Sequence, residues 1–203
     1  MITKMISGIK YFFNMPTVPK HLLYRKSPLV MHVSDTPDYI YKYLIRIIRQ
    51  LNPEVLIHTG DIIDNTKMEN RNHLEESYAN IFSKFVVNLK KHNTGKIILV
   101  PGNHDNIEIM TKQCQDCIIA NEGSIIELFG KSFELSHYAE KLSGKADYCL
   151  YGHNSKSINN KNFYNGYIHI NFFLPVEEIV LTMKYPIGIL EMRGIQKPFP
   201  RGI

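Results

Sequence analysis

The first half of the chain alternates short apolar runs with segments whose apolar residues recur at helical spacing. The runs at 29–33, 55–58 and 96–100 each end at turn residues, which predicts three buried strands. Between these runs, apolar residues return every three or four positions over 40–51 and over about 72–91, which predicts two amphipathic helices. Unbroken apolar strands that alternate with helices are typical of a parallel sheet covered on both faces.

The second half of the chain is richer in strands. Its helical segments become short from about residue 107, and its apolar runs are separated by turn residues. The runs that predict strands are 124–129, 131–136, 147–151, 167–171 and 179–183. Together the two halves predict an α/β sandwich in which two sheets face each other and helices lie outside.

The excess of basic residues is concentrated at the start of the chain. Among 203 residues there are 24 Lys and Arg and 19 Asp and Glu, a formal net charge of +5. The first 28 residues hold 5 of these bases and no acid, so residues 29–203 carry 19 bases (24 minus 5) and 19 acids. We therefore expect a basic N-terminal extension over 1–28 and one domain over 29–203. A neutral domain gives no electrostatic reason to expect nucleic acid as its partner.

Two further features narrow the class of protein. No apolar run approaches the roughly eighteen residues that a membrane-spanning helix needs, and the N-terminal segment lacks the continuous apolar core of a secretory signal. We therefore expect a cytoplasmic protein with no membrane partner. Cys114 and Cys117 form a single C-x-x-C without the second pair that a structural zinc site needs, so they are expected to be reduced thiols.

Polar clusters follow five of the predicted strands. They are Asp35, Gly60-Asp61, Gly102-Asn103-His104-Asp105, Ser136-His137 and Gly152-His153. Because the carboxyl ends of parallel strands meet at one edge of a sheet, these side chains are expected to converge. Carboxylate, amide and imidazole donors together suit Mn²⁺, Fe²⁺ or Zn²⁺ better than Ca²⁺ or Mg²⁺. His32 and His58 lie inside predicted strands, so we expect them to be core histidines.

The order of these clusters resembles the pattern of the calcineurin-like metallophosphoesterases, which is D-x-H, G-D-x-x, G-N-H-[DE], a single H and G-H-x-H. The chain reads Asp35-Thr36-Pro37, Gly60-Asp61-Ile62-Ile63, Gly102-Asn103-His104-Asp105, His137 and Gly152-His153-Asn154-Ser155. The resemblance covers about 29–183. It implies a four-layer αββα sandwich of two mixed sheets flanked by helices, with phosphoester hydrolysis at the clustered residues.

The resemblance also assigns roles residue by residue. The residues that it implies as ligands of one metal ion are Asp61, Asn103, His137 and His153. The family binds a pair of ions, and the resemblance makes Asp35 a ligand of the other one, which we call the first ion. Asp61 bridges the two ions. It implies that His104 contacts the phosphate and acts as general acid, and we expect Asp105 to orient the His104 imidazole.

The chain departs from the family pattern at the first ion. Pro37 and Ser155 replace the histidine of D-x-H and the last histidine of G-H-x-H. Proline has no donor and a neutral hydroxyl is a poor substitute for imidazole, so we expect the first ion to be weakly held or absent. The cofactor expected is therefore one firmly bound divalent transition metal, Mn²⁺ before Fe or Zn.

These residues favour a metal-dependent phosphoesterase that acts on a small phosphoester, and a phosphodiesterase in preference to a monoesterase. The alternative is a catalytically impaired protein of the same fold that serves as a binding or protein-interaction scaffold, because half of a two-metal site is lost. A third hypothesis, less favoured, is a nucleic-acid phosphodiesterase that uses segment 1–28 as an electrostatic arm. Its binding would weaken steeply with added salt.

Overall fold

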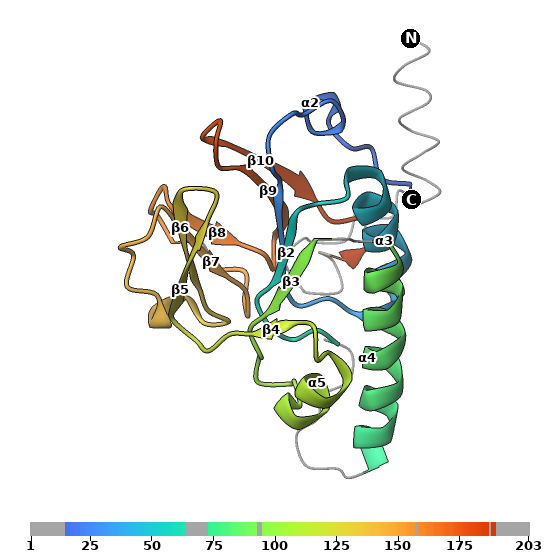
Figure 1. Cartoon of the computed structure of the whole chain (residues 1–203). Coiled ribbons are helices and arrows are strands. Elements are labelled where there is room, and N and C mark those ends of the chain that lie inside the picture. The colour runs from blue at the N-terminus through green and yellow to red at the C-terminus, as the bar shows by residue number, and fades with distance from the viewer. Residues whose placement is uncertain (1–14, 64–72, 93–94, 157, 187, 190–203) are drawn as a thin grey trace, which may run out of the picture.

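The computed structural model describes residues 15–63, 73–92, 95–156, 158–186 and 188–189, and it is organised around two mixed β-sheets (Figure 1). The larger sheet has six strands in the order β10-β9-β1-β2-β3-β4. Strands β1 to β4 are parallel to one another, and β9 is antiparallel to both β1 and β10. The bounds of these strands are β1 Val30–Val33, β2 Val55–His58, β3 Lys96–Leu99, β4 Ile118–Ile119, β9 His169–Leu174 and β10 Ile179–Lys184.

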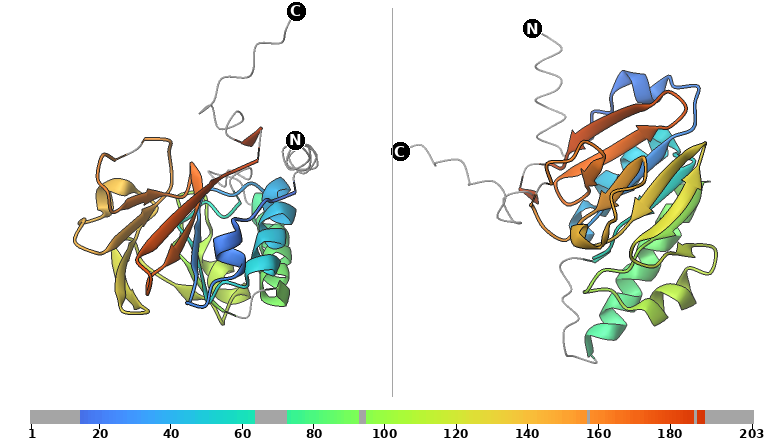
Figure 2. Two further views of the ribbon diagram at one scale, coloured as in Figure 1. Left: turned by 90° about the horizontal axis from the view of Figure 1, so that it is seen from above. Right: turned by 90° about the vertical axis from the view of Figure 1, so that its left-hand side faces the viewer.

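The smaller sheet has four strands in the order β5-β6-β7-β8 and packs against one face of the larger sheet (Figure 2). Strand β5 is antiparallel to β6, whereas β6, β7 and β8 are parallel. Their bounds are β5 Ser124–Leu128, β6 Lys131–Leu135, β7 Tyr148–Tyr151 and β8 Phe163–Asn165.

The longer helices cover the other face of the larger sheet (Figure 1). They are α3 Tyr41–Leu51, α4 His73–His92 and α5 Ile107–Gln113. The remaining helical elements are α2 Lys20–Leu23 and the two 3-10 helices η1 Asp38–Ile40 and η2 Ala139–Lys141. The predicted α/β class, with two mixed sheets flanked by helices, is confirmed.

The parallel strands are mostly apolar because they contribute to two cores. In β1, Val30 belongs to the core between the two sheets, whereas Met31 and Val33 belong to the core beneath the helices. Strand β2 follows the same rule, with Ile57 on the inter-sheet side and Leu56 on the helix side. Since water reaches neither face, no polar alternation marks these strands in the sequence.

The predicted helix over 40–51 is α3 preceded by η1, and its apolar positions are those expected. Leu44, Ile47, Ile48 and Leu51 are each at most 2% exposed. The helix ends at Asn52, which adopts φ 40° and ψ 66° while its N–H donates to the Ile48 carbonyl. Asparagine tolerates this left-handed conformation better than most residues, which explains why the helix stops there.

Four short elements were not among the predictions. Helix α2 has four residues, η2 and strand β8 have three each, and strand β4 has two. Neither the helical nor the strand period can be recognised over so few positions. Strand β8 pairs with β7 in parallel, so it extends the smaller sheet beyond the runs that the pattern predicts.

Phe133 fills the space between the two sheets. Its side chain is 0% exposed, and its ring centroid lies 4.8 Å from that of Tyr148 and 5.5 Å from that of Phe173. Replacing Phe133 by leucine is expected to lower the free energy of unfolding by about 1–2 kcal/mol, because the smaller side chain leaves a void beside both rings. Urea denaturation measures this loss. Phe129→Leu is the matched control, since Phe129 is 39% exposed, and an equal loss in both variants would contradict the prediction.

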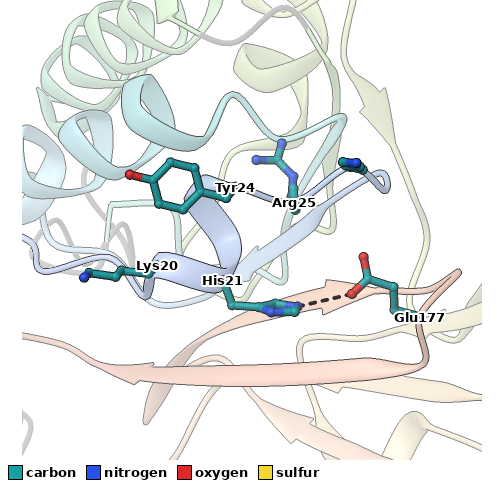
Figure 3. A pocket seen from close by; sticks show the side chains of 6 residues that line it. Lys20, His21, Tyr24, Arg25 and Glu177 are labelled. Atoms are coloured by element: carbon teal, nitrogen blue, oxygen red, sulfur yellow. Dashed lines mark hydrogen bonds and ion pairs between the residues drawn. The ribbon is translucent and has the colours of Figure 1, made fainter.

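The described end of the basic N-terminal segment is attached to the domain. Leu22 is 0% exposed within the helix-side core, and the Arg25 guanidinium donates to the Leu51 carbonyl at 2.7 Å. His21 of α2 lies beside Glu177, in the turn between β9 and β10, with Nε2 and Oε2 3.2 Å apart (Figure 3). The division of the chain after residue 28 stays a prediction.

Cys114 and Cys117 lie side by side after α5, with their Cα atoms 5.2 Å apart. The Cys117 N–H donates to the Cys114 carbonyl at 2.9 Å, and this turn brings the two side chains together. The expectation of reduced thiols stays a prediction. Cys149 is a buried free thiol, and burial raises its pKa to about 12.

His32 and His58 are core histidines, as expected. Both are 0% exposed, and His58 Nε2 lies 2.8 Å from the Thr36 hydroxyl. The Asn171 amide donates to His32 Nδ1 at 3.1 Å, so the neutral His32 ring carries its proton on Nε2, which lies 2.8 Å from the Thr59 hydroxyl. Burial lowers the pKa of His32 from 6.5 to about 3.

The depressed pKa of His32 predicts that part of the stability is lost in acid. Between pH 6.5 and about 3 the unfolded chain binds a proton at His32 that the folded chain does not, so stability falls as the pH falls. The contribution of this group is at most about 1.4 kcal/mol per pH unit. Urea denaturation of the wild type and His32→Gln at pH 7, 6 and 5 measures it. The stability advantage of the wild type should shrink at each step; an advantage that stays constant contradicts the prediction.

Candidate metal centre

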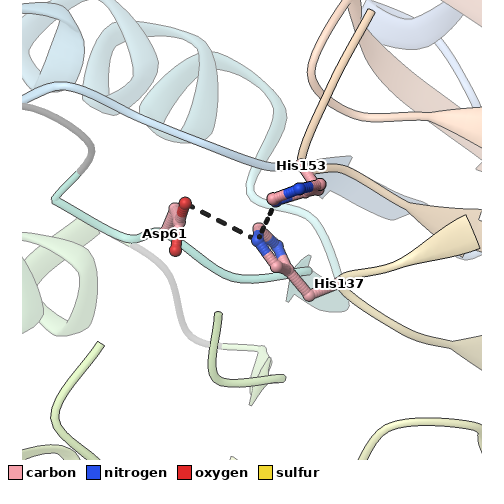
Figure 4. A group of neighbouring side chains, drawn as sticks. All are labelled: Asp61, His137 and His153. Atoms are coloured by element: carbon pink, nitrogen blue, oxygen red, sulfur yellow. Dashed lines mark hydrogen bonds and ion pairs between the residues drawn. The ribbon is translucent and has the colours of Figure 1, made fainter. Parts of the chain in front are cut away.

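The predicted site residues lie in loops that follow strands of both sheets. Asp61 follows β2, Asn103 and His104 follow β3, His137 follows β6 and His153 follows β7. Figure 4 shows Asp61, His137 and His153 directed toward one another. The carboxyl ends of strands from the two sheets therefore meet at one site, as the strand-end rule predicts.

Three of these residues form a group with metal-binding geometry. Asp61, His137 and His153 each offer one ligand atom, and these atoms all lie within 4.8 Å of one another. His137 Nε2 lies 3.5 Å from Asp61 Oδ2 and 3.2 Å from His153 Nδ1. The side chain of Asn103 joins the group, since its Oδ1 is 3.1 Å from His137 Nε2. All four residues implied as ligands of one ion are thus brought together.

The contacts of His137 suit a metal ligand. Its Nδ1 donates to the Thr59 carbonyl at 2.8 Å, because a carbonyl oxygen can only accept. Its Nε2 faces two oxygen atoms, Asp61 Oδ2 and Asn103 Oδ1. In the neutral ring this nitrogen carries a lone pair, so a cation among the three atoms would be bound by all of them, and His137 is 0% exposed.

The donor set suits a divalent transition metal. One carboxylate oxygen, one amide oxygen and two imidazole nitrogens are a mixture of hard and borderline donors. Burial, and the neighbouring His137, lower the pKa of His153, which keeps its imidazole neutral and available as a ligand. The residues present therefore fit the metal ion that the sequence predicts.

Two glycines of the motifs allow the backbone to approach this site. A Cβ on Gly102 would lie 2.3 Å from Asp61 Oδ1, and a Cβ on Gly60 would lie 2.5 Å from His137 Nδ1. Gly60 also has φ +95°, a conformation that residues with a side chain rarely adopt. The glycines that precede Asp61 and Asn103 are thus required by close contact.

His104 lies beside the ligand group rather than in it. Its backbone N–H donates to Asp61 Oδ1 at 3.0 Å, and the Asn103 amide donates to its Nε2 at 2.9 Å. Its Nε2 is 3.9 Å from Asp61 Oδ2. The Nδ1 atom is buried and has no hydrogen-bond partner among the described residues. His104 therefore holds an unused polar atom next to the candidate metal centre.

Asp105 does not orient His104. Its Oδ1 accepts from the Ile62 N–H at 3.0 Å and from the Tyr78 hydroxyl at 2.9 Å, and its Oδ2 accepts from the Gly102 N–H at 2.9 Å. The expected carboxylate–imidazole pair is therefore wrong, because three other donors occupy the carboxylate. Asp105 instead ties the loops after β2 and β3 to α4.

Asp35 contacts the site through the backbone of His153. It is 1% exposed, and its Oδ2 accepts from the His153 N–H at 3.0 Å. His153 has φ 69°, so this bond holds a strained backbone. Asp35 lies outside the group of three ligand residues, and its role as a ligand of the first ion stays a prediction.

Tyr138 is a site residue that the sequence reasoning missed. Its hydroxyl donates to Asn103 Oδ1 at 3.0 Å, and its ring centroid lies 4.4 Å from that of His153. Burial and the neighbouring carboxylates raise the pKa of Tyr138, so the hydroxyl keeps its proton and remains a donor. Its place directly after His137 is the signal that could have identified it.

The described ranges contain no helix that is both long and apolar enough to cross a membrane.

The chain is similar to one protein family and to several solved structures. The family model described as calcineurin-like phosphoesterase matches residues 28–189, whereas no curated protein matches the sequence. One solved structure has a TM-score of 0.51 at 10% identity, over 78% of this chain and 99% of that one. The phosphoesterase YfcE from E. coli has a TM-score of 0.48 at 15% identity, over 77% of this chain and 99% of that one. Nuclease MPE from Pseudomonas putida has a TM-score of 0.38 at 15% identity, over 76% of this chain and 87% of that one.

Proposed function

We propose that this chain, which belongs to the calcineurin-like phosphoesterases, is a phosphodiesterase with one firmly bound divalent metal ion. The observation that carries the proposal is the environment of His137 Nε2. Its lone pair faces the oxygen atoms of Asp61 and Asn103, and His153 Nδ1 lies 3.2 Å away. Mn²⁺ is the ion we favour, with Fe and Zn as alternatives, because the donors mix oxygen and imidazole nitrogen.

The residues at the site of the first ion support the binding of one ion rather than two. Pro37 offers no side-chain donor, and Ser155 is exposed. Asp35 has a carboxylate oxygen within hydrogen-bond distance of the His153 N–H. A second ion would therefore have to rely on Asp35 and Asp61, which are too few ligands for firm binding.

The roles of the residues follow from their positions. A divalent ion held by Asp61, Asn103, His137 and His153 would supply Lewis acidity and positive charge to a phosphate. His104 would donate a proton to the leaving oxygen as the phosphorus–oxygen ester bond breaks. Its imidazole is placed for this because Nε2 lies beside the ligand group, 3.9 Å from Asp61 Oδ2.

The charge around the site supports a diester substrate. Among the described residues, Lys141 is the cationic side chain beside Tyr138, and it is paired with Glu122 at 3.3 Å. A phosphate monoester at neutral pH carries close to two negative charges and a diester carries one. With Asp61 as the anionic ligand, a single divalent ion leaves a net charge of about +1 at the centre, which matches a diester better. A small phosphodiester is the substrate class we propose.

Elemental analysis of protein purified without chelator tests the metal content. We expect about one transition-metal ion per chain, and hydrolysis of bis(p-nitrophenyl) phosphate that exceeds hydrolysis of p-nitrophenyl phosphate. Removing the metal with a chelator should abolish this hydrolysis, and adding Mn²⁺ should restore it. Two firmly bound ions per chain would contradict the single-ion proposal, and none would contradict the metal centre.

A scaffold without catalysis is the second candidate function. The replacement of two histidines by Pro37 and Ser155 favours it. Against it stands His104, whose imidazole lies beside the ligand group with Nε2 3.9 Å from Asp61 Oδ2, a position that a scaffold does not need to fill with a histidine. A protein with metal but no hydrolysis of either p-nitrophenyl ester would favour the scaffold. The nucleic-acid hypothesis and the cytoplasmic location stay predictions.

A further inference from the structure

A carboxylate outside the predicted motifs holds the loop that carries His137. Glu122 lies between β4 and β5, and its Oε2 accepts from the His137 N–H at 3.0 Å and from the Tyr138 N–H at 3.5 Å. The same oxygen accepts from the Ser136 hydroxyl. Three consecutive residues of the loop after β6 therefore donate to a single carboxylate oxygen.

The second oxygen of Glu122 extends this clamp to the edge of the site. Oε1 accepts from Lys141 at 3.3 Å, and the Lys141 ammonium lies 4.7 Å from the centroid of the Tyr138 ring. The Tyr138 hydroxyl in turn donates to Asn103 Oδ1, one of the atoms that face His137 Nε2. Glu122 is thus connected to two candidate ligands, to His137 directly and to Asn103 through Tyr138.

We infer that Glu122 is a positioning residue for the metal centre, which it serves by fixing the backbone of His137. This inference rests on the proposed function, because it takes His137 as a metal ligand. The imidazole of His137 is restrained at Nδ1 by the Thr59 carbonyl at 2.8 Å, and its backbone is restrained by Glu122. The direction of the Nε2 lone pair depends on both restraints. Loss of a residue that orients a ligand typically weakens metal binding by about 10–100-fold.

Glu134, on strand β6, provides a matched control. Its carboxylate also accepts two backbone N–H groups, from Ser143 at 2.6 Å and from Gly144 at 3.0 Å. The two residues that it holds lie after η2 in the same connection between β6 and β7, six and seven positions beyond His137, and neither is a candidate ligand. A carboxylate that merely stabilises a loop of this sheet should therefore behave as Glu134 does, and one that positions a ligand should differ from it.

The test compares the full-length wild type with Glu122→Ala, Glu122→Gln and Glu134→Ala. Isothermal titration of metal-free protein with Mn²⁺ should show binding weakened by about 10–100-fold in Glu122→Ala. Glu122→Gln should recover most of the affinity, because the amide oxygen still accepts from N–H groups. Glu134→Ala should bind Mn²⁺ as the wild type does. Thermal melts establish that each variant is folded at the titration temperature.

Amide hydrogen exchange of the metal-free proteins gives a readout that does not depend on the metal. In Glu122→Ala the His137 and Tyr138 amides should exchange at least about 10-fold faster than in the wild type, and in Glu134→Ala the Ser143 and Gly144 amides should do so instead. Unchanged exchange at His137, unchanged Mn²⁺ affinity in Glu122→Ala, or an equal loss of affinity in Glu134→Ala would overturn the inference. If the wild type binds no Mn²⁺, the proposed function fails, and exchange at His137 alone decides whether Glu122 fixes this backbone.

Discussion

Replacing His137 by alanine is expected to remove the firmly bound metal ion and to lower phosphodiester hydrolysis by about 10³-fold or more, which corresponds to about 4 kcal/mol of lost transition-state stabilisation. His137 is the centre of the ligand group, because its Nε2 lies 3.1–3.5 Å from ligand atoms of Asn103, His153 and Asp61. Without it, no other described His, Cys, Asp or Glu completes a group of three around Asp61 and His153.

Elemental analysis and the rate with bis(p-nitrophenyl) phosphate measure the two losses in the same preparation. His169→Ala is the matched control, since His169 is a partly buried histidine on β9 that contributes no atom to the ligand group. This control should keep both the metal and the rate. Because His137 is fully buried, a thermal melt must accompany each measurement. A folded His137→Ala protein with wild-type metal content would contradict the proposed centre.

Replacing His104 by alanine is expected to leave the metal in place and to lower hydrolysis of a diester with an alkyl leaving group by about 10²–10⁴-fold, the range of general-acid catalysis. The expectation follows from its geometry. His104 stands outside the ligand group, with Nε2 3.9 Å from Asp61 Oδ2. Its imidazole can therefore move a proton without giving up a bond to the ion.

The dependence on the leaving group distinguishes an acid from a residue that only shapes the site. An alkoxide needs a proton as the ester bond breaks, whereas p-nitrophenolate leaves without one. The His104→Ala rate should therefore fall steeply for an alkyl diester and much less for bis(p-nitrophenyl) phosphate. Equal losses for both substrates would show that His104 is not the acid. A loss of metal in this variant would make it a ligand instead.

The sequence by itself determined the chain's main strands and the loops in which the site lies. The run at 55–58 could be recognised as a buried strand because both of its faces are covered, so that its first three residues are all apolar and no polar alternation appears. Parallel strands place their carboxyl ends at one edge, so Asp61 and Asn103 had to be neighbours once the strands were known. The same rule, applied to the smaller sheet, brought His137 and His153 to the same place.

Only the tertiary structure decided which partner each polar group has. Asp105 is adjacent to His104 in the sequence, yet its carboxylate binds donors from Ile62, Tyr78 and Gly102, which come from three separate segments. Glu122 lies fifteen positions before His137, and no period or motif links them. The sequence specifies strands through local burial patterns, but a hydrogen bond between distant segments depends on how loops pack. The candidate metal ligands were therefore visible in the chain, and the hydrogen-bond partners of their loops were not.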